Sequence, residues 1–470
     1  MATGVAIDDA NPAAPAALGD QADTQPWPSS GLAWYAVVAL ALMVMLGFME
    51  SQILNYLIKP IKRDFGLSDL KMSVLMGIAP TILYAILGFP LARLIDRLRR
   101  KAVLGAALGI AGIMTTLAGF TQNFWQFAAC RVMSDGYRAV SNPGAYSIMA
   151  DYFPRLKLPR AIAVLTFGLV MGRALAPVYA GAVVGLATAW GSWHLGGLLI
   201  RDWQTVYLMS GSLGFTACLL MLTIKEPPRR GLMRQTGAQG AAARPAGNSL
   251  PLSAVFVYIW QNKRLFLPQF ISLAFFSVES FGLESWRMEF LRRTYGWEPQ
   301  VAGPVLGTAA LCAQAFGLIV GTRFAEWLAV RRDDANLRTA AILYTILPVF
   351  AVASPLMPTP YLSIACSAMT GLLGVACAAP QNAALQSITP NEMRGQMTAL
   401  YYFTIQAIGM GIGPTVMAFV TDVIIGDESK IRFAMAGSAL AVTPMAAIAM
   451  WFAVRPYGRA IAAIKAGEQG

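Results

Sequence analysis

The chain has 470 residues, of which 56% are hydrophobic and only 13% are charged. A soluble domain usually carries about a quarter of its residues as charges to wet its surface, so this composition excludes a soluble globular protein. The net charge of +12 does not indicate nucleic-acid binding, because the basic residues flank apolar stretches. These stretches are about 20 residues long, which is the length an α-helix needs to cross a hydrocarbon core.

In chain order, the sequence first predicts a disordered cytoplasmic tail over residues 1–31, which contain no Lys or Arg. Twelve apolar spans follow, and they predict an all-α membrane protein. We expect an N-terminal six-helix bundle over 32–224, a cytoplasmic linker over 225–264, a C-terminal six-helix bundle over 265–455 and a cytoplasmic tail over 456–470. The spans, called helices one to twelve below, are 32–57, 72–95, 102–121, 124–150, 161–187, 203–224, 265–291, 300–328, 338–356, 360–386, 395–424 and 432–454.

The Lys and Arg residues set the predicted orientation. Loops after even-numbered helices, together with the C-terminal tail, hold 23 of them, whereas loops after odd-numbered helices hold 9. Because cytoplasmic loops carry the excess of basic residues, both termini are expected in the cytoplasm of a multi-pass protein of the cell membrane. The first external loop, with Lys59, Lys62, Arg63 and Lys71, is a local exception to this rule.

Residues that suit a metal, a cofactor or a disulfide are few. The five cysteines all fall within apolar spans without ligand spacing, a pattern typical of small buried apolar side chains. His194 is the only histidine, and it lies in a stretch expected to form an interfacial loop. The sequence also contains no Gly-rich Lys motif for binding phosphate. We therefore expect no cofactor, no metal site, no enzymatic activity and no ATP-driven pumping by this chain.

Three local matches relate the two halves of the chain. Residues 93–96 (RLID) after helix two resemble residues 323–326 (RFAE) after helix eight. Gly172 and Pro177 of helix five have the spacing of Gly409 and Pro414 of helix eleven, and a Pro-to-Arg stretch opens both helices. Parallel six-helix repeats of this kind place a substrate site near the midplane between the halves.

Several stretches resemble the major facilitator superfamily. Residues 88–101 (GFPLARLIDRLRRK) are similar to its signature loop between helices two and three. The resemblance extends to the Spinster-like branch through residues 66–100, 142–154 (NPGAYSIMADYFP), 225–230 (KEPPRR) and 388–414, and it covers roughly residues 32–455. It implies twelve transmembrane helices in two pseudo-symmetric six-helix bundles and transport by alternating access.

Two positions depart from the family's pattern. Members usually carry Asp-Arg late in helix one, where this chain has Glu50-Ser51. They usually carry Glu in a Gly-Glu-Ala-Gly stretch of helix four, where this chain has residues 137–140 (YRAV). A cation has thus moved from helix one to helix four, and an acid has been lost there. The family's proton-coupling scheme therefore does not transfer directly to this chain.

Ionisable residues at membrane depth are candidates for function because each costs several kcal/mol unless it pairs or faces water. In helix four, Arg131, Asp135 and Arg138 recur at helical spacing, and Asn142 and Tyr146 extend the same polar face. Arg131 and Asp135 are expected to pair, either as a structural ion pair or in proton coupling. For Arg138 we predict Glu50 of helix one as the partner. Glu50 and Asp135 are then proton carriers, and Arg138 is a switch or the substrate's counter-ion.

Helices five, seven, ten and eleven supply further candidates. Arg173 of helix five would favour an anionic substrate, although pairing with a neighbouring acid is an equal alternative. In helix seven, Glu284 and Arg287 stand three residues apart and can satisfy each other, which leaves Glu279 as the proton candidate of the second half. Polar residues of helices ten and eleven could hydrogen-bond a substrate or merely hold helices together; they are Gln381, Asn382, Gln386, Tyr401, Tyr402 and Gln406. Of these, Gln381, Tyr401 and Gln406 are the predicted binding residues.

A separate charged set lies at the cytoplasmic side. It resembles the charge lock by which the superfamily stabilises one conformation, and it consists of Arg93, Asp96, Arg97 and Arg100 with Asp151 at the end of helix four. Its expected role is gating. Cytoplasmic anchoring alone explains the arginines, but it does not explain the two acids.

These features predict a secondary transporter for a small organic anion or amphiphile, coupled to protons and acting as a monomer in the bilayer. Two alternatives stay open at this point. An uncoupled facilitator of the same fold needs no titrating acid, and a membrane sensor binds solute without flux.

Overall fold

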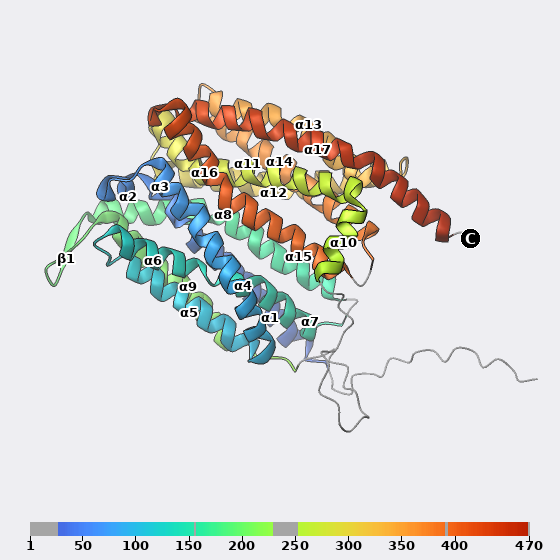
Figure 1. Cartoon of the computed structure of the whole chain (residues 1–470). Helices are drawn as coiled ribbons and strands as arrows, with labels where there is room; N and C mark the ends of the chain where they lie inside the picture. The colour runs from blue at the N-terminus through green and yellow to red at the C-terminus, as the bar shows by residue number, and fades with distance from the viewer. Residues whose placement is uncertain (1–26, 155–156, 229–251, 391–392, 469–470) are drawn as a thin grey trace, which may run out of the picture.

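The long apolar runs fold as helices because a backbone in lipid must satisfy its own hydrogen bonds. The structure is a computed structural model that describes residues 27–154, 157–228, 252–390 and 393–468 (Figure 1). Most of the predicted tail, residues 1–26, and most of the predicted linker, residues 229–251, lie outside the described residues.

The N-terminal half contains the first six predicted helices. Its elements are α1 (Ser30–Gln52), the 3₁₀ turn η1 (Ile53–Tyr56), α2 (Ile58–Phe65), α3 (Asp69–Ser73), the π-helical segment η2 (Val74–Ile78), α4 (Ala79–Arg97), α5 (Arg100–Ala118), α6 (Phe124–Asp135), α7 (Arg138–Tyr152), α8 (Leu158–Trp190), β1 (Trp193–Leu195), β2 (Leu198–Ile200) and α9 (Asp202–Thr223). Side-chain caps mark two helix starts, since Ser68 and Asn123 accept hydrogen bonds from backbone amides of the first turn.

The C-terminal half contains the last six predicted helices. Its elements are α10 (Leu252–Gln261), α11 (Lys263–Tyr295), α12 (Pro299–Ala329), α13 (Ala335–Leu356), α14 (Pro360–Ile388), α15 (Arg394–Thr404), the π-helical segments η4 (Ile405–Met410) and η5 (Val420–Ile425) on either side of α16 (Gly411–Phe419), the 3₁₀ turn η6 (Glu428–Lys430) and α17 (Ile431–Glu468). Helix eleven therefore runs through α15, η4, α16 and η5.

Helix four is interrupted where the sequence predicts one continuous span. Eleven helices of the described residues are long and apolar enough to cross a membrane, and the segment 124–152 is absent from that set because it breaks into α6 and α7. The break falls at Gly136 and Tyr137, directly between the charged residues Asp135 and Arg138. The remaining predicted spans each coincide with helix, so the all-α fold of twelve helices is confirmed.

Three connecting regions differ from the sequence-based expectation. The stretch 225–264 was expected to be a linker throughout, yet residues 252–261 form α10. Residues 456–468 were expected to be a tail, yet they continue α17. The loop with His194 forms the two-stranded antiparallel hairpin β1–β2, in which His194 pairs with Leu199.

The bundle has two distinct ends. We call the end with α2, α3 and β1–β2 the hairpin end, and the end with the start of α1, α10 and the C-terminus the termini end (Figure 1). A set of cross-half hydrogen bonds and ion pairs lies between the middle of the helices and the hairpin end. They join Lys62 to Glu428, Asp69 to Arg293, Leu70 to Asp422, Ser73 to Thr415, Arg138 to Met410, and both Gln52 and Arg173 to Glu284.

Close backbone contact between the halves depends on glycine. A Cβ atom on Gly303 of α12 would lie 2.3 Å from the carbonyl oxygen of Pro177 in α8, and one on Gly77 of η2 would lie 2.6 Å from the carbonyl oxygen of Met410 in η4. No larger side chain fits at either place without a backbone shift. The two halves therefore pack tightly along helices five and eight and along helices two and eleven.

Candidate functional site

The break in helix four places three charged side chains together. Asp135 is the last residue of α6 and is almost fully buried, with 2% of its side chain exposed. One of its oxygens, Oδ2, lies 2.8 Å from Nη1 of Arg131, one turn earlier, and the other, Oδ1, lies 3.3 Å from Nε of Arg138 at the start of α7. Arg131 also donates to the carbonyl oxygen of Ser51 in helix one, at 2.9 Å. The carboxylate of Asp135 thus forms ion pairs with the guanidinium groups of both Arg131 and Arg138.

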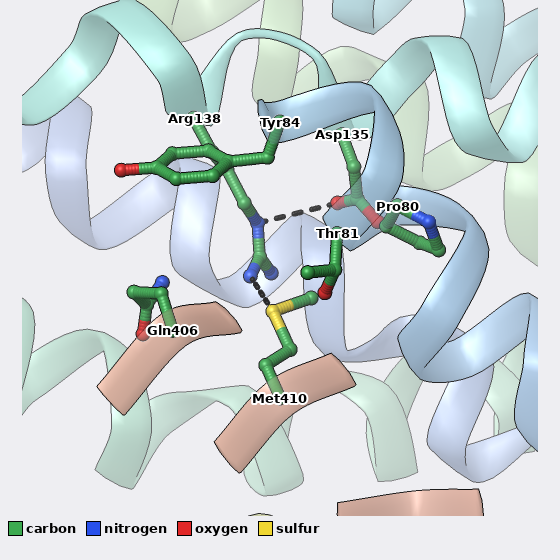
Figure 2. Close-up of a pocket in the computed structure, with 7 residues that line it drawn as sticks. All are labelled: Pro80, Thr81, Tyr84, Asp135, Arg138, Gln406 and Met410. Atoms are coloured by element: carbon green, nitrogen blue, oxygen red, sulfur yellow. Dashed lines mark hydrogen bonds and ion pairs between the residues drawn. The ribbon is translucent and has the colours of Figure 1, made fainter. Parts of the chain in front are cut away.

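Arg138 lines a small cavity between the two halves (Figure 2). The cavity has a volume of about 10 Å³, roughly the room one water needs. Helix two contributes Pro80, Thr81 and Tyr84, helix four contributes Asp135 and Arg138, and helix eleven of the other half contributes Gln406 and Met410. Nη1 of Arg138 lies 3.1 Å from Sδ of Met410. Arg138 is therefore in contact with both halves at the middle of the bundle.

The predicted pairing of Arg138 with Glu50 is wrong. Arg138 pairs with Asp135, three residues earlier, because the turn at residues 136–137 brings these two side chains to the same side. Glu50 is buried inside the N-terminal half, where its Oε1 accepts a hydrogen bond from Thr115 of α5 and its Oε2 has no hydrogen-bond partner among the described residues. A Cβ atom on Gly214 of α9 would lie 3.1 Å from that Oε2. Glu50 thus faces helices three and six.

Glu279 of α11 is buried inside the C-terminal half. Its residue is 2% exposed, and neither carboxylate oxygen has a hydrogen-bond partner in the described part of the chain. It lies on the same face of α11 as Ser272, which donates to Ala446 of α17, and Trp286, which donates to Pro414 of α16. Glu279 and Glu50 are therefore both buried acids within their own halves.

A second charged cluster joins helices five and seven. The spacing allows Glu284 to pair with Arg287, but Glu284 pairs with Arg173 of the other half, and Gln52 donates to it at 3.3 Å. The alternative that Arg173 pairs with an acid is therefore the one observed. Both charged side chains of this cross-half pair are partly exposed. The expectation of a local pair failed because it considered only neighbours on one helix. Arg287, which sequence reasoning treated as satisfied, makes no hydrogen bond or ion pair with any described residue.

The polar candidates of the second half divide into two groups. Gln406 lines the cavity with Arg138. Gln381 and Tyr401 instead bond to each other, since the Tyr401 hydroxyl donates to Oε1 of Gln381 at 3.0 Å in a buried position within the C-terminal half. In helix four, Tyr146 is 43% exposed, and the side chain of Asn142 lies outside the described residues. Of the predicted uncharged binding residues whose side chains the structure describes, only Gln406 lines the cavity with Arg138.

Comparison with known proteins assigns the family. The model of the Major Facilitator Superfamily matches residues 40–414, most of the chain. The chain belongs to the Major Facilitator Superfamily. It is 27% identical to an MFS-type efflux pump of Mycolicibacterium smegmatis over 91% of this chain and 94% of the pump. It is 25% identical to the gallate transporter of Pseudomonas putida over 47% of each chain, and 24% identical to protein spinster of Drosophila melanogaster over 42% of this chain and 30% of that protein.

A solved structure supports the same fold. The crystal structure of a bacterial homologue of the human lysosomal transporter Spinster, in an inward-facing and unoccupied conformation, superposes with a TM-score of 0.73 at 21% identity. The match covers 92% of this chain and 98% of that one. The predicted resemblance to the superfamily and to Spinster proteins is therefore confirmed, and the chain is a secondary transporter of the membrane.

A network of charges closes the transporter at the hairpin end. Asp69 is fully buried and accepts two hydrogen bonds from Arg293 of the other half, at 2.7 and 2.8 Å, as well as one from Lys62. Lys62 also donates to Glu428 at 2.7 Å. Arg293 lies 2.5 Å from Glu289. This hairpin-end network accounts for Lys62, one of the four basic residues of the first external loop, because its charge is neutralised by acids from both halves.

The termini end carries the predicted gating residues of this transporter. Arg100 is buried, pairs with Asp151, and donates at 3.0 Å to the carbonyl oxygen and to the hydroxyl of Ser147. Arg97 is exposed. The side chains of Arg93 and Asp96 lie outside the described residues. All the bonds of Arg100 stay within the N-terminal half and the segment that follows it, including a backbone hydrogen bond from its own amide to Glu226 at 2.7 Å.

Proposed function

We propose that this transporter carries a small organic anion across the cell membrane by alternating access, coupled to protons. One observation carries the proposal. Arg138 lies in the middle of the bundle and lines a cavity between the two halves. Its charge is only partly neutralised by Asp135, because that carboxylate also pairs with Arg131. An arginine keeps its charge at physiological pH, so it is suited to hold an anion. The P. putida relative, a gallate transporter, is consistent with this substrate class.

The pairing of charges at bilayer depth supports an anionic substrate. Four arginines lie at that depth, Arg131, Arg138, Arg173 and Arg287, together with four acids, Glu50, Asp135, Glu279 and Glu284. Among the described residues only Asp135 and Glu284 are bonded to an arginine, and Arg287 is bonded to no acid. Unpaired cations in a low-dielectric region are costly, and an anion entering between the halves would offset that cost.

The orientation of the chain follows from its basic loops. The excess of Lys and Arg at the termini end places that end in the cytoplasm. The cross-half bonds then close the external side, since they run from the middle of the helices to the hairpin end. In this orientation the conformation faces inward, and the hairpin-end network must open for the transporter to face outward.

Proton coupling is assigned to acids that can change partners. When a substrate anion occupies Arg138, the carboxylate of Asp135 loses part of the charge that holds it ionised. Asp135 can then accept a proton, and Glu50 lies close enough to act electrostatically on the same cluster. Glu279 has no donor to either oxygen and is the proton candidate of the second half. The cytoplasmic set, Arg100 with Asp151, is assigned to gating.

The test is flux into proteoliposomes that contain the purified protein. Uptake of a panel of aromatic and aliphatic carboxylates is measured with and without a pH gradient. We expect accumulation of at least one anion that depends on the gradient, and its loss in Arg138→Ala. Arg331→Ala is the control, because the Arg331 side chain is exposed just after α12, bonds among the described residues only to the carbonyl oxygen of Trp327 and should leave flux unchanged. Normal transport by Arg138→Ala, with the control also normal, would remove Arg138 from the site.

The same assay separates the alternatives. A double variant, Glu50→Gln with Asp135→Asn, should lose accumulation against a gradient but keep downhill exchange. If this variant accumulates solute as well as the wild type does, protons do not couple through these acids. Flux that ignores the gradient in the wild type indicates an uncoupled facilitator. Binding of a solute without any flux indicates a sensor.

A further inference from the structure

Arg287 of α11 stands out as a cation without a bonded partner in the described part of the chain. It lies in the membrane-spanning part of helix seven and is only partly exposed. It stands one turn after Glu284, which bonds to Arg173 of the N-terminal half, so it lies near the face of α11 that meets that half. Glu284, Tyr56, Arg173 and Glu279 all act on its charge electrostatically. A guanidinium at this depth needs an anion or several acceptors to offset its desolvation.

The carboxylate nearest to Arg287 along the helix is already in use. Glu284, one turn earlier, is bonded to Arg173 of the other half and accepts a further hydrogen bond from Gln52 at 3.3 Å. Arg173 also lies over the ring of Phe48, 5.8 Å from its centroid. The side chains of Arg173 and Glu284 are 34% and 26% exposed, so the pair is not sealed within the packed helices. Of the two guanidinium groups, only that of Arg173 is bonded to a carboxylate.

We propose that Arg173 is a subsite for the carboxylate of the transported anion, that Glu284 is its resident competitor, and that Arg287 receives Glu284 when the anion displaces it. The proposal rests on the proposed anion transport and deepens it by naming a second point of contact beyond Arg138. The anion takes the place of Glu284 on Arg173. The released Glu284 turns to Arg287, which is at the favourable i, i+3 position on the same helix.

This exchange connects substrate binding to the contact between the halves. In the present conformation, the bond between Arg173 and Glu284 joins the N-terminal half to the C-terminal half. When the anion binds, the cross-half bond is replaced by a bond within α11 and by a bond from Arg173 to the substrate. The two cations, Arg173 and Arg287, are then balanced by two anions, Glu284 and the substrate carboxylate. Substrate binding thereby loosens one of the links that close the hairpin side.

The test compares the binding of benzoate and its neutral analogue benzamide to purified full-length protein, measured by calorimetry and by the shift in melting temperature. The wild type should bind benzoate and not benzamide. Arg287→Gln should weaken benzoate binding roughly tenfold or more, because the displaced Glu284 then has no cation on its own helix and its charge-assisted bond to Arg287 is lost. Glu284→Gln should strengthen benzoate binding roughly tenfold, because the competitor is removed. Arg264→Gln, at an exposed position on α11, is the control and should bind as the wild type does.

The opposite signs of the two variants distinguish a binding role from a structural one. If both variants weaken benzoate binding, or if Arg287→Gln binds normally, the subsite is refuted. Failure of the wild type to bind benzoate in preference to benzamide also refutes it. Arg287→Lys keeps the charge and should retain most of the binding, which guards against misfolding of the glutamine variant. If the protein shows gradient-driven flux but the Arg287 and Glu284 variants do not change benzoate binding as expected, only this subsite is refuted. If benzoate binds selectively but no flux is measured, only the proposed transport is refuted.

Discussion

Removal of the Asp69 charge should open the hairpin end of the transporter. Asp69 has none of its side chain exposed, and it accepts two hydrogen bonds from Arg293 of the other half as well as one from Lys62. Removing one partner of such a buried pair costs about 3–5 kcal/mol. We expect Asp69→Asn to fall at the lower end, about 3 kcal/mol, because Glu289 still neutralises Arg293. That energy is lost only from the conformation in which the two halves meet.

The expected consequence is a shift of population and not merely a loss of stability. A difference of about 3 kcal/mol changes an equilibrium constant by about 150-fold. Spin labels at Arg63 of the N-terminal half and Glu298 of the C-terminal half, both exposed, report the distance across this end. The labels are introduced after the native cysteines have been replaced. We expect one short distance in the otherwise wild-type protein and a substantial longer component in Asp69→Asn.

Two comparisons make this prediction refutable. Asp202→Asn is the matched control, since Asp202 lies at the same end but bonds to Ser192 within its own half. The double variant Asp69→Asn with Arg293→Gln should be less perturbed than the sum of the single changes, because it leaves no buried unpaired charge. An unchanged distance distribution in Asp69→Asn, or strict additivity in the double variant, would show that the hairpin-end network does not hold the halves together.

Two further predictions concern packing and pH. Gly303→Val should destabilise the contact between α12 and α8 by about 1–3 kcal/mol through overpacking, since a Cβ at residue 303 would lie 2.3 Å from a backbone oxygen. Gly371→Val is the control, because a Cβ at residue 371 meets nothing within 4 Å. Equal melting temperatures for the two variants would contradict this prediction. Burial raises the pKa of Asp334, but hydrogen bonds from Arg338 and Arg332 outweigh it and hold that pKa below its ordinary value. The ionised Asp334 carboxylate therefore stabilises the fold above about pH 4. The difference in melting temperature between wild type and Asp334→Asn should shrink as the pH falls below that value. A constant difference from pH 7 to pH 3 would contradict this prediction.

The helices could be predicted from the sequence because hydrocarbon thickness and backbone hydrogen bonding leave apolar runs few alternatives. The interruption of helix four could not, because a single glycine such as Gly136 disfavours a helix by only about 1 kcal/mol and is often tolerated inside one. Only contact with helices one, two and eleven decides between these local structures. For the same reason, α10 and the extension of α17 depend on packing that hydropathy does not record.

The charged residues could be selected from the sequence, but their partners could not. A charge at membrane depth is noticeable in any apolar span, so Glu50, Asp135, Arg138 and Arg173 were all recognised as candidates. Pairing depends on which helices meet. Arg138 bonds to Asp135 across a turn that was not foreseen, and Arg173 bonds to an acid that is 111 positions away in the chain. Local spacing had assigned that acid to Arg287.

Access to Gln406 from each side of the membrane tests most directly whether the cavity at Arg138 is the alternating site. Gln406 lines that cavity from helix eleven, and Gln406→Cys in a background without native cysteines offers a single target for a membrane-impermeant thiol reagent. We expect modification from the cytoplasmic side in the wild-type background and a marked rise in modification from the external side when Asp69→Asn is added. Equal modification from both sides in both backgrounds, or none from either, would contradict alternating access at this cavity.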